Sequence, residues 1–108
     1  MPLTLDNIEG EFLRRFPDVA AAVREDAGMD PAGRVDWVLR HYVMPNAIDN
    51  RDALREVFDW IERLMQSQDP LVEYWRDVRL LGRTLASPEW TAIAEAYEGP
   101  LLAGHWGR

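Results

Sequence analysis

Residue types that carry out catalysis or bind metals are scarce in this sequence. Cysteine and lysine are absent, which excludes thiolate nucleophiles, thiolate metal ligands, disulfides and lysine-based catalysis. The two histidines, His41 and His105, lie far apart, and neither belongs to a ligand motif such as Glu-x-x-His. Ser67 and Ser87 fall in predicted turns, outside any Gly-x-Ser-x-Gly motif. We therefore expect a non-enzymatic protein with no metal site and no cofactor.

Carboxylates are the one group of reactive side chains with a regular spacing. Asp52, Glu56 and Asp59 are three or four residues apart and so share one side of a predicted helix. An acid–base pair would need one carboxyl removed from water, but these residues lie opposite the apolar side of that helix. A solvated face is the simplest interpretation; if the face is functional, it is a docking surface that includes Asp49. The arginines of the next predicted helix are candidates to neutralise part of it or to bind a carboxylate-bearing partner: Arg76, Arg79 and Arg83.

Two tryptophans at the borders of apolar stripes are further candidates for partner binding. Trp37 falls nearly opposite the inner face of its predicted helix, and Trp60 flanks the stripe of the next one. Tryptophan is enriched at the centres of protein interfaces, although packing of one helix over another explains both residues without a partner. Glu62 and Glu73 also lie near apolar borders, where they are candidates for buried ion pairs with arginines.

The overall charge limits the kinds of partner. The net charge is −7, with nine acids and five arginines in residues 1–50 and ten acids and seven arginines in residues 51–108. Without a basic tail or stripe, binding to nucleic acid or to an anionic membrane is disfavoured. An acidic surface would instead attract a basic protein, although the charge is also explained by solubility alone.

Helical periodicity predicts the elements that position these residues, with a hairpin of two amphipathic helices over residues 52–85 at the centre. Asp69-Pro70 is the start signal of the second helix, because the carboxylate can accept free N–H groups and proline lacks one. The stripe of the first helix is Leu54, Val57, Phe58, Ile61, Leu64 and Met65, and that of the second is Leu71, Tyr74, Trp75, Val78, Leu81 and Leu85.

Proline and glycine mark the expected starts and ends of the other helices. We expect a helix that begins at Thr4 or Asp6, with Glu9 completing a capping box, and ends at Pro17. A second helix is expected from Pro17 to Asp26, stopped by Gly28, and a third from Asp30-Pro31 to about Val43, ended by Pro45. A long connector from Met44 to Arg51 follows, in which Asp49 or Asn50 caps the hairpin. After the hairpin we expect a helix from Ser87-Pro88 to Gly99-Pro100 and then a tail.

These elements predict one all-α domain, residues 1–108, built as a bundle of about five helices around the hairpin. No stretch alternates as a strand does. No apolar run approaches the length of a membrane span, and the first residues lack the layout of a signal peptide. We therefore expect a cytoplasmic protein.

The hairpin and the residues after it resemble a family of small, all-helical bacterial proteins of uncharacterised type. The resemblance covers roughly residues 50–106 and rests on the F-D-W-I-E segment at 58–62, the turn at Asp69-Pro70, and Gly99-Pro100-Leu101. Some members resemble immunity proteins, which neutralise toxins delivered between competing cells. The resemblance implies a protein partner and no catalytic residues.

Two functions remain open from the sequence. The first is an immunity protein that occludes a cognate toxin, for which a basic protein is a candidate, through Asp49, Asp52, Glu56 and Asp59 with Trp37 and Trp60. The second is a regulatory or adaptor module, which could form a homo-oligomer through exposed tryptophans. A third alternative, a small-molecule-binding or catalytic bundle, requires a buried polar pocket with at least two ionisable groups.

Overall fold

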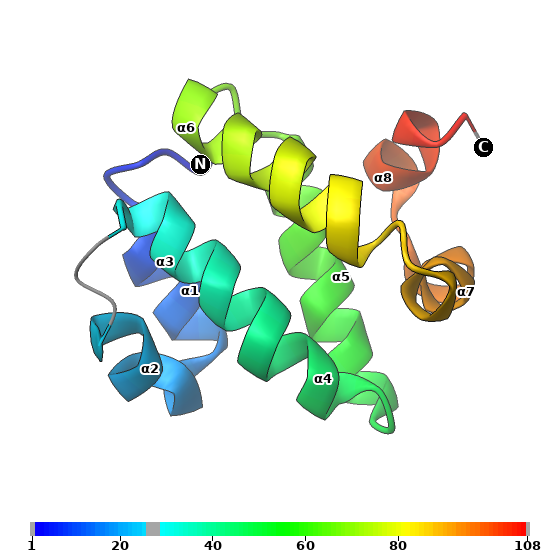
Figure 1. Ribbon diagram of the computed structural model, residues 1–108, viewed down its shortest axis with the longest axis horizontal. Helices are drawn as coiled ribbons and strands as arrows, with labels where there is room; N and C mark the ends of the chain where they lie inside the picture. The colour runs from blue at the N-terminus through cyan, green and yellow to red at the C-terminus, as the bar shows by residue number, and fades with distance from the viewer. Residues whose placement is uncertain (1, 26–28, 108) are drawn as a thin grey trace.

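The computed structural model describes residues 2–25 and 29–107, which form seven continuous helical segments and no strand. The all-α prediction is confirmed, whereas the expected number of about five helices is not. Three segments join elements of different helical type, and Figure 1 shows how the segments are arranged. In chain order the elements are α1 (Ile8–Arg15); η1 (Pro17–Val19), which leads into α2 (Ala20–Glu25); α3 (Pro31–Val38), which continues through η2 (Leu39–Val43) into α4 (Met44–Ala47); α5 (Arg51–Met65); α6 (Pro70–Tyr74), which continues as η3 (Trp75–Thr84); α7 (Pro88–Tyr97); and α8 (Pro100–His105).

Helix α5 is the element on which most of the others pack. It contacts α4, α6, α7 and α8, so apolar residues around much of its circumference are buried. Its expected stripe is confirmed, with Met65 partly exposed, and Asn50 caps the helix by accepting the N–H of Ala53 at 3.1 Å. The α3–α4 and α6–η3 segments lie side by side, and α7 and α8 lie near the C-terminus (Figure 1). The buried residues of α5 are Leu54, Val57, Phe58, Trp60, Ile61 and Leu64.

The prediction that Pro45 ends a helix is wrong, because the helix widens before it reaches the proline. Over η2 the chain makes a π-helical turn, in which the N–H of Met44 bonds to the carbonyl of Leu39, five residues back. A shifted hydrogen-bond register accommodates a residue that has no N–H of its own. The helix therefore runs to Ala47, and the expected long connector shrinks to a short turn. Tyr42, in the widened turn, is 47% exposed.

A longer π-helical stretch, η3, changes the phase of the second hairpin helix. The N–H of Leu85 bonds to the carbonyl of Leu80 at 2.8 Å, and a Cβ at Gly82 would lie 2.9 Å from the carbonyl oxygen of Asp77. Glycine thus fits a turn that brings the backbone this close. The predicted stripe is only partly correct: Leu81 and Leu85 are buried with Val72 and Leu80, Trp75 is half-buried, and the exposed members are Leu71, Tyr74 and Val78.

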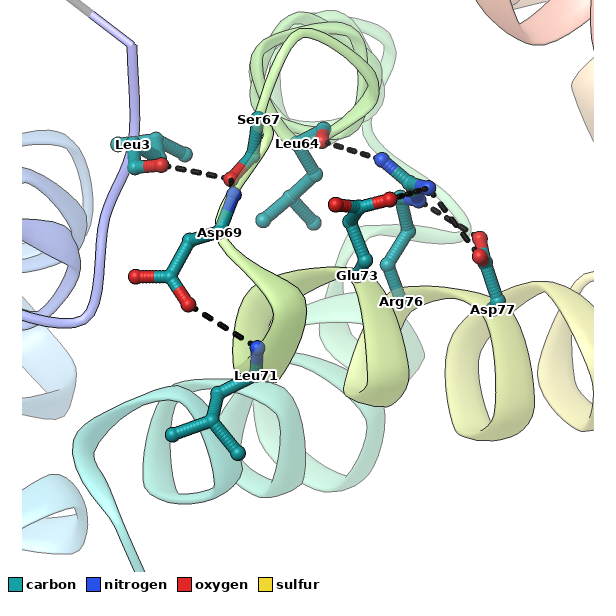
Figure 2. A network of polar contacts seen from close by, with 8 residues as sticks. All are labelled: Leu3, Leu64, Ser67, Asp69, Leu71, Glu73, Arg76 and Asp77. Atoms are coloured by element: carbon teal, nitrogen blue, oxygen red, sulfur yellow. Dashed lines mark hydrogen bonds and ion pairs between the residues drawn. The ribbon is translucent and has the colours of Figure 1, made fainter.

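The turn between α5 and α6 holds the N-terminal segment (Figure 2). Ser67 Oγ donates to the carbonyl of Leu3 at 2.6 Å, and Asp69 Oδ2 accepts the N–H of Leu5 at 2.8 Å. The other oxygen of Asp69 accepts the N–H of Leu71 at 3.0 Å, so the predicted start signal is confirmed. The hydrogen bond from Leu5 is the main reason that the pKa of Asp69 lies below its ordinary value.

Two other start signals are confirmed, and one is not. Asp30 accepts the N–H of Gly33 at 2.8 Å, and Ser87 accepts that of Trp90 at 3.4 Å. Helix α1 begins later than expected, at Ile8, and its N-cap residue Asn7 makes no side-chain cap hydrogen bond. The expected stop at Gly28 lies outside the described residues.

The C-terminal tail folds into α8, which the sequence did not predict as a helix. The carboxylate of Glu62 on α5 accepts the N–H groups of Leu101 at 2.6 Å and Leu102 at 3.2 Å. Gly99 makes this approach possible, because a Cβ there would lie 2.6 Å from the carboxyl carbon of Glu62. The expectation that Glu62 pairs with an arginine is therefore corrected: it caps another helix.

Candidate functional site

Four of the predicted site residues lie close together along one edge of the fold. Asp52, Glu56 and Asp59 follow one another on the outer face of α5, and their side chains are 93, 54 and 72% exposed. Asp49 is exposed in the turn that leads into the helix. The helix positions the first three because their spacing of four and three residues returns to the same side. We call these four residues the acidic face.

Arginines neutralise part of the acidic face. Arg15, at the end of α1, lies 3.6 Å from Glu56 and 3.8 Å from Asp59. Arg55 lies 3.6 Å from Asp52, on the same helix. These long pairs at the surface contribute little to stability, so the carboxylates remain accessible to a partner. The arginines expected in this role, Arg76, Arg79 and Arg83, belong to η3.

An apolar cleft opens beside the acidic face. Its volume is about 360 Å³, and it lies between the end of α1, η1, the η2–α4 segment and the first turn of α5. The charged residues that line it are Arg15, Asp18 and Glu56. Arg15 and Glu56 also line a neighbouring polar hollow of about 370 Å³. Sequence reasoning missed this cleft because its walls come from separate segments of the chain. Its apolar lining is Phe16, Pro17, Val19, Tyr42, Val43, Ala47 and Ala53.

The two predicted tryptophan anchors have different environments. Trp37 is 39% exposed on α3, and its ring contacts that of His41 at a tilt of 37°, with the centroids 3.9 Å apart. Trp60 is fully buried in the core, where its ring meets Phe12 edge-on at 5.3 Å. Trp60 is therefore removed from the candidate surface, because α1 covers the side of α5 on which it lies. Its Nε1 has no hydrogen-bond partner among the described residues.

One carboxyl group is buried beside two arginines. Asp36 on α3 accepts a hydrogen bond from Arg40 Nε at 2.8 Å. Burial raises the pKa of Asp36 to about 6, although the charge and hydrogen bond of Arg40 and the charge of Arg79 oppose the shift. The cavity that Asp36 helps to line has a volume of about 10 Å³, which is room for about one water molecule. This group is too enclosed to meet a substrate, and we interpret it as structural.

The described part of the chain contains neither a cluster of metal-ligating side chains nor a helix that could span a membrane. No group of three or more histidine, aspartate and glutamate side chains in this part of the chain is placed to hold a metal ion. No described helix is both long and apolar enough to cross a membrane. His41 and His105 are both exposed.

Comparison with known proteins identified no relative. No family model matches the chain, and neither the curated proteins nor the solved structures contain a match.

Proposed function

We propose that the protein is a non-enzymatic binding module whose partner docks on the acidic face and inserts a bulky apolar side chain into the neighbouring cleft. The observation that carries this proposal is the position of Glu56, which belongs to the acidic face and also lines the cleft of about 360 Å³. Protein interfaces concentrate their binding energy in such places, where an anchor side chain fills an apolar pocket and charged groups surround it.

The specific form of the proposal is an immunity protein that neutralises a cognate toxin by stoichiometric occlusion in the cytoplasm. It is motivated by the resemblance, drawn from the sequence, of residues 50–106 to a family of small all-helical bacterial proteins, some members of which resemble immunity proteins. The carboxylates of the acidic face would speed the approach of a basic toxin, and burial of the anchor would slow its release. The alternative, an adaptor module, uses the same surface but leaves the partner's activity unchanged.

The first test is a pull-down from the native host with three baits: the wild-type chain, the variant D52R/E56R/D59R, and the control D6R/E89R/E95R. The control makes the same change in charge at exposed positions outside the acidic face. We expect a partner that binds the wild type and the control and is lost with the first variant. Equal binding of the partner to all three baits would contradict the proposed surface.

The second test fills the cleft. Ala53 lines it, so A53F should weaken binding of the captured partner, whereas A92F, at an exposed position on α7, should not. Calorimetric titration measures both affinities. If the partner is a toxin, one equivalent of wild-type protein should abolish its activity; unchanged activity would replace the immunity proposal with the adaptor alternative.

A further inference from the structure

A second exposed apolar surface lies on the α3 and α6–η3 segments, and the proposed function does not use it. Among the described residues, four of the six exposed large apolar side chains occur there: Trp37, Leu71, Tyr74 and Val78, which are 39, 43, 47 and 44% exposed. Helix α3 packs along η3, and the two segments lie side by side (Figure 1). Exposed apolar side chains on neighbouring segments of a protein commonly mark an interface.

The α6–η3 segment presents the centre of this surface. Tyr74 and Val78 are four residues apart and face away from α5, because the opposite side of the segment carries the buried Val72 and Leu80. Gly82, the next residue at this spacing, is also exposed and has no side chain that would hold another molecule away. We call the line of Tyr74, Val78 and Gly82 the η3 ridge.

Charges of opposite sign border the two sides of the η3 ridge. On the side toward α5 lie Glu73 and Asp77, and both contact Arg76, whose guanidinium also donates to the carbonyl of Leu64 on α5 at 3.0 Å (Figure 2). Asp77 Oδ1 is 2.7 Å from Arg76 Nε, and Glu73 Oε2 is 3.9 Å from its Nη2.

On the side toward α3 lie Arg79 and Arg83. The guanidinium of Arg79 stands 5.9 Å from the centroid of the Trp75 ring. That ring rests against Gly33 of α3, where an added Cβ would lie 2.8 Å from it. Arg83 follows four residues later and is exposed. Arg76 offsets one of the two carboxylates on the side toward α5, so that side carries a net single negative charge. The side toward α3 is basic.

We propose that the η3 ridge binds a second copy of this chain, with the two η3 segments parallel. A two-fold axis parallel to the helices places the acidic side of each ridge against the basic side of the other. Asp77 then faces the exposed Arg83 of the second copy, and this contact occurs twice. An antiparallel pair would place like charges together and is disfavoured.

This charge pattern selects the occupant. A uniformly acidic partner would be repelled by Glu73 and Asp77, and a uniformly basic one by Arg79 and Arg83. A copy of the chain carries the matching pattern at the same spacing. Because each copy has a net charge of −7, mutual repulsion weakens the pair, and we expect a dimer that dissociates on dilution.

Sedimentation velocity of the purified full chain over a range of concentrations tests the proposal. The wild type should shift from monomer to dimer as concentration rises, and V78E should stay monomeric. D77R and R83E should each raise the dissociation constant roughly tenfold, because two attractive pairs become repulsive. The controls E89R and R51E make the same changes in charge at exposed positions away from the ridge and should dimerise as the wild type does.

A mixture of D77R and R83E provides the decisive measurement. Each variant alone repels itself. In the mixed pair, however, the two substituted side chains carry opposite charges and face each other, and the unchanged Asp77 of one copy faces the unchanged Arg83 of the other. Dimerisation should therefore return to the wild-type level. Circular dichroism confirms that each variant is folded. A wild type that stays monomeric at every concentration, a dimer insensitive to V78E, or a mixture that associates no better than its components would each overturn the proposal.

Discussion

Removal of the Glu62 carboxylate should release α8 from α5. The carboxylate accepts two N–H groups at the start of α8, at 2.6 and 3.2 Å, and these donors have no partner within their own helix. Hydrogen bonds to a charged group contribute about 1.5–3 kcal/mol each when buried. Because this site is only partly buried, we expect E62A to lower the free energy of unfolding by about 2–3 kcal/mol in total.

A glutamine at this position separates the effect of charge from that of shape. In E62Q one oxygen remains as an acceptor, but the amide NH₂ faces a backbone N–H. We therefore expect E62Q to cost about 1–2 kcal/mol, less than E62A. The control is E95Q, which removes a charge at an exposed position of α7 and should change the free energy of unfolding by less than about 0.5 kcal/mol.

Urea denaturation followed by tryptophan fluorescence measures these changes, and hydrogen exchange at the amides of Leu101 and Leu102 reports on the contact itself. G99A should act on the same contact, because its Cβ displaces the carboxylate. In a double-mutant cycle, G99A should therefore cost less in the E62A background than in the wild type. Additive effects, or an E62A variant as stable as E95Q, would refute the capping role of Glu62.

Two further predictions concern stability. Asp36 has a pKa of about 6 in the folded protein against an ordinary value of 3.8, so the unfolded chain ionises first as the pH rises. The free energy of unfolding should therefore fall by about 2 kcal/mol between pH 4 and pH 7. Urea denaturation at each pH should show that D36N loses this pH dependence, and an unchanged dependence would assign it to other groups. G82A should lower the free energy of unfolding by roughly 1–3 kcal/mol, because its Cβ would lie 2.9 Å from the carbonyl oxygen of Asp77. The control G10A, on α1, adds a Cβ that meets nothing within 4 Å and should be neutral or stabilising. Equal effects of the two substitutions on stability would show that the π-helical turn does not require glycine.

Features encoded by neighbouring residues were predictable from the sequence. Asp30, Asp69 and Ser87 each precede a proline and accept an N–H group within three residues, so a short stretch of sequence contains the whole signal. The acidic face was predictable for the same reason, since carboxylates on adjacent turns of one helix, and in the turn just before it, need no information from the rest of the chain.

Features that depend on distant residues were not predictable. The burial of Trp60 requires α1 to cover α5, and the partner of Glu62 lies 39 residues away. The cleft requires several segments to meet. The orientation of Tyr74 and Val78 depends on the π-helical turns of η3, because a widened turn rotates every side chain relative to the phase of an α-helix.

The N-terminal segment and helix α8 both form hydrogen bonds with the end of α5 or with the turn that follows it. Leu3 is held by Ser67, 64 residues away, and α8 by Glu62. The contact between Leu3 and Ser67 can form only after α5 and its turn have been synthesised. The contact between Glu62 and α8 can form only after α8 has been synthesised. Because long loops must close before either contact forms, the last stage of folding should be slow for a small helical protein. A bulky fusion beside either segment would disturb the same stretch of the central helix, and a tag therefore needs a long, flexible linker.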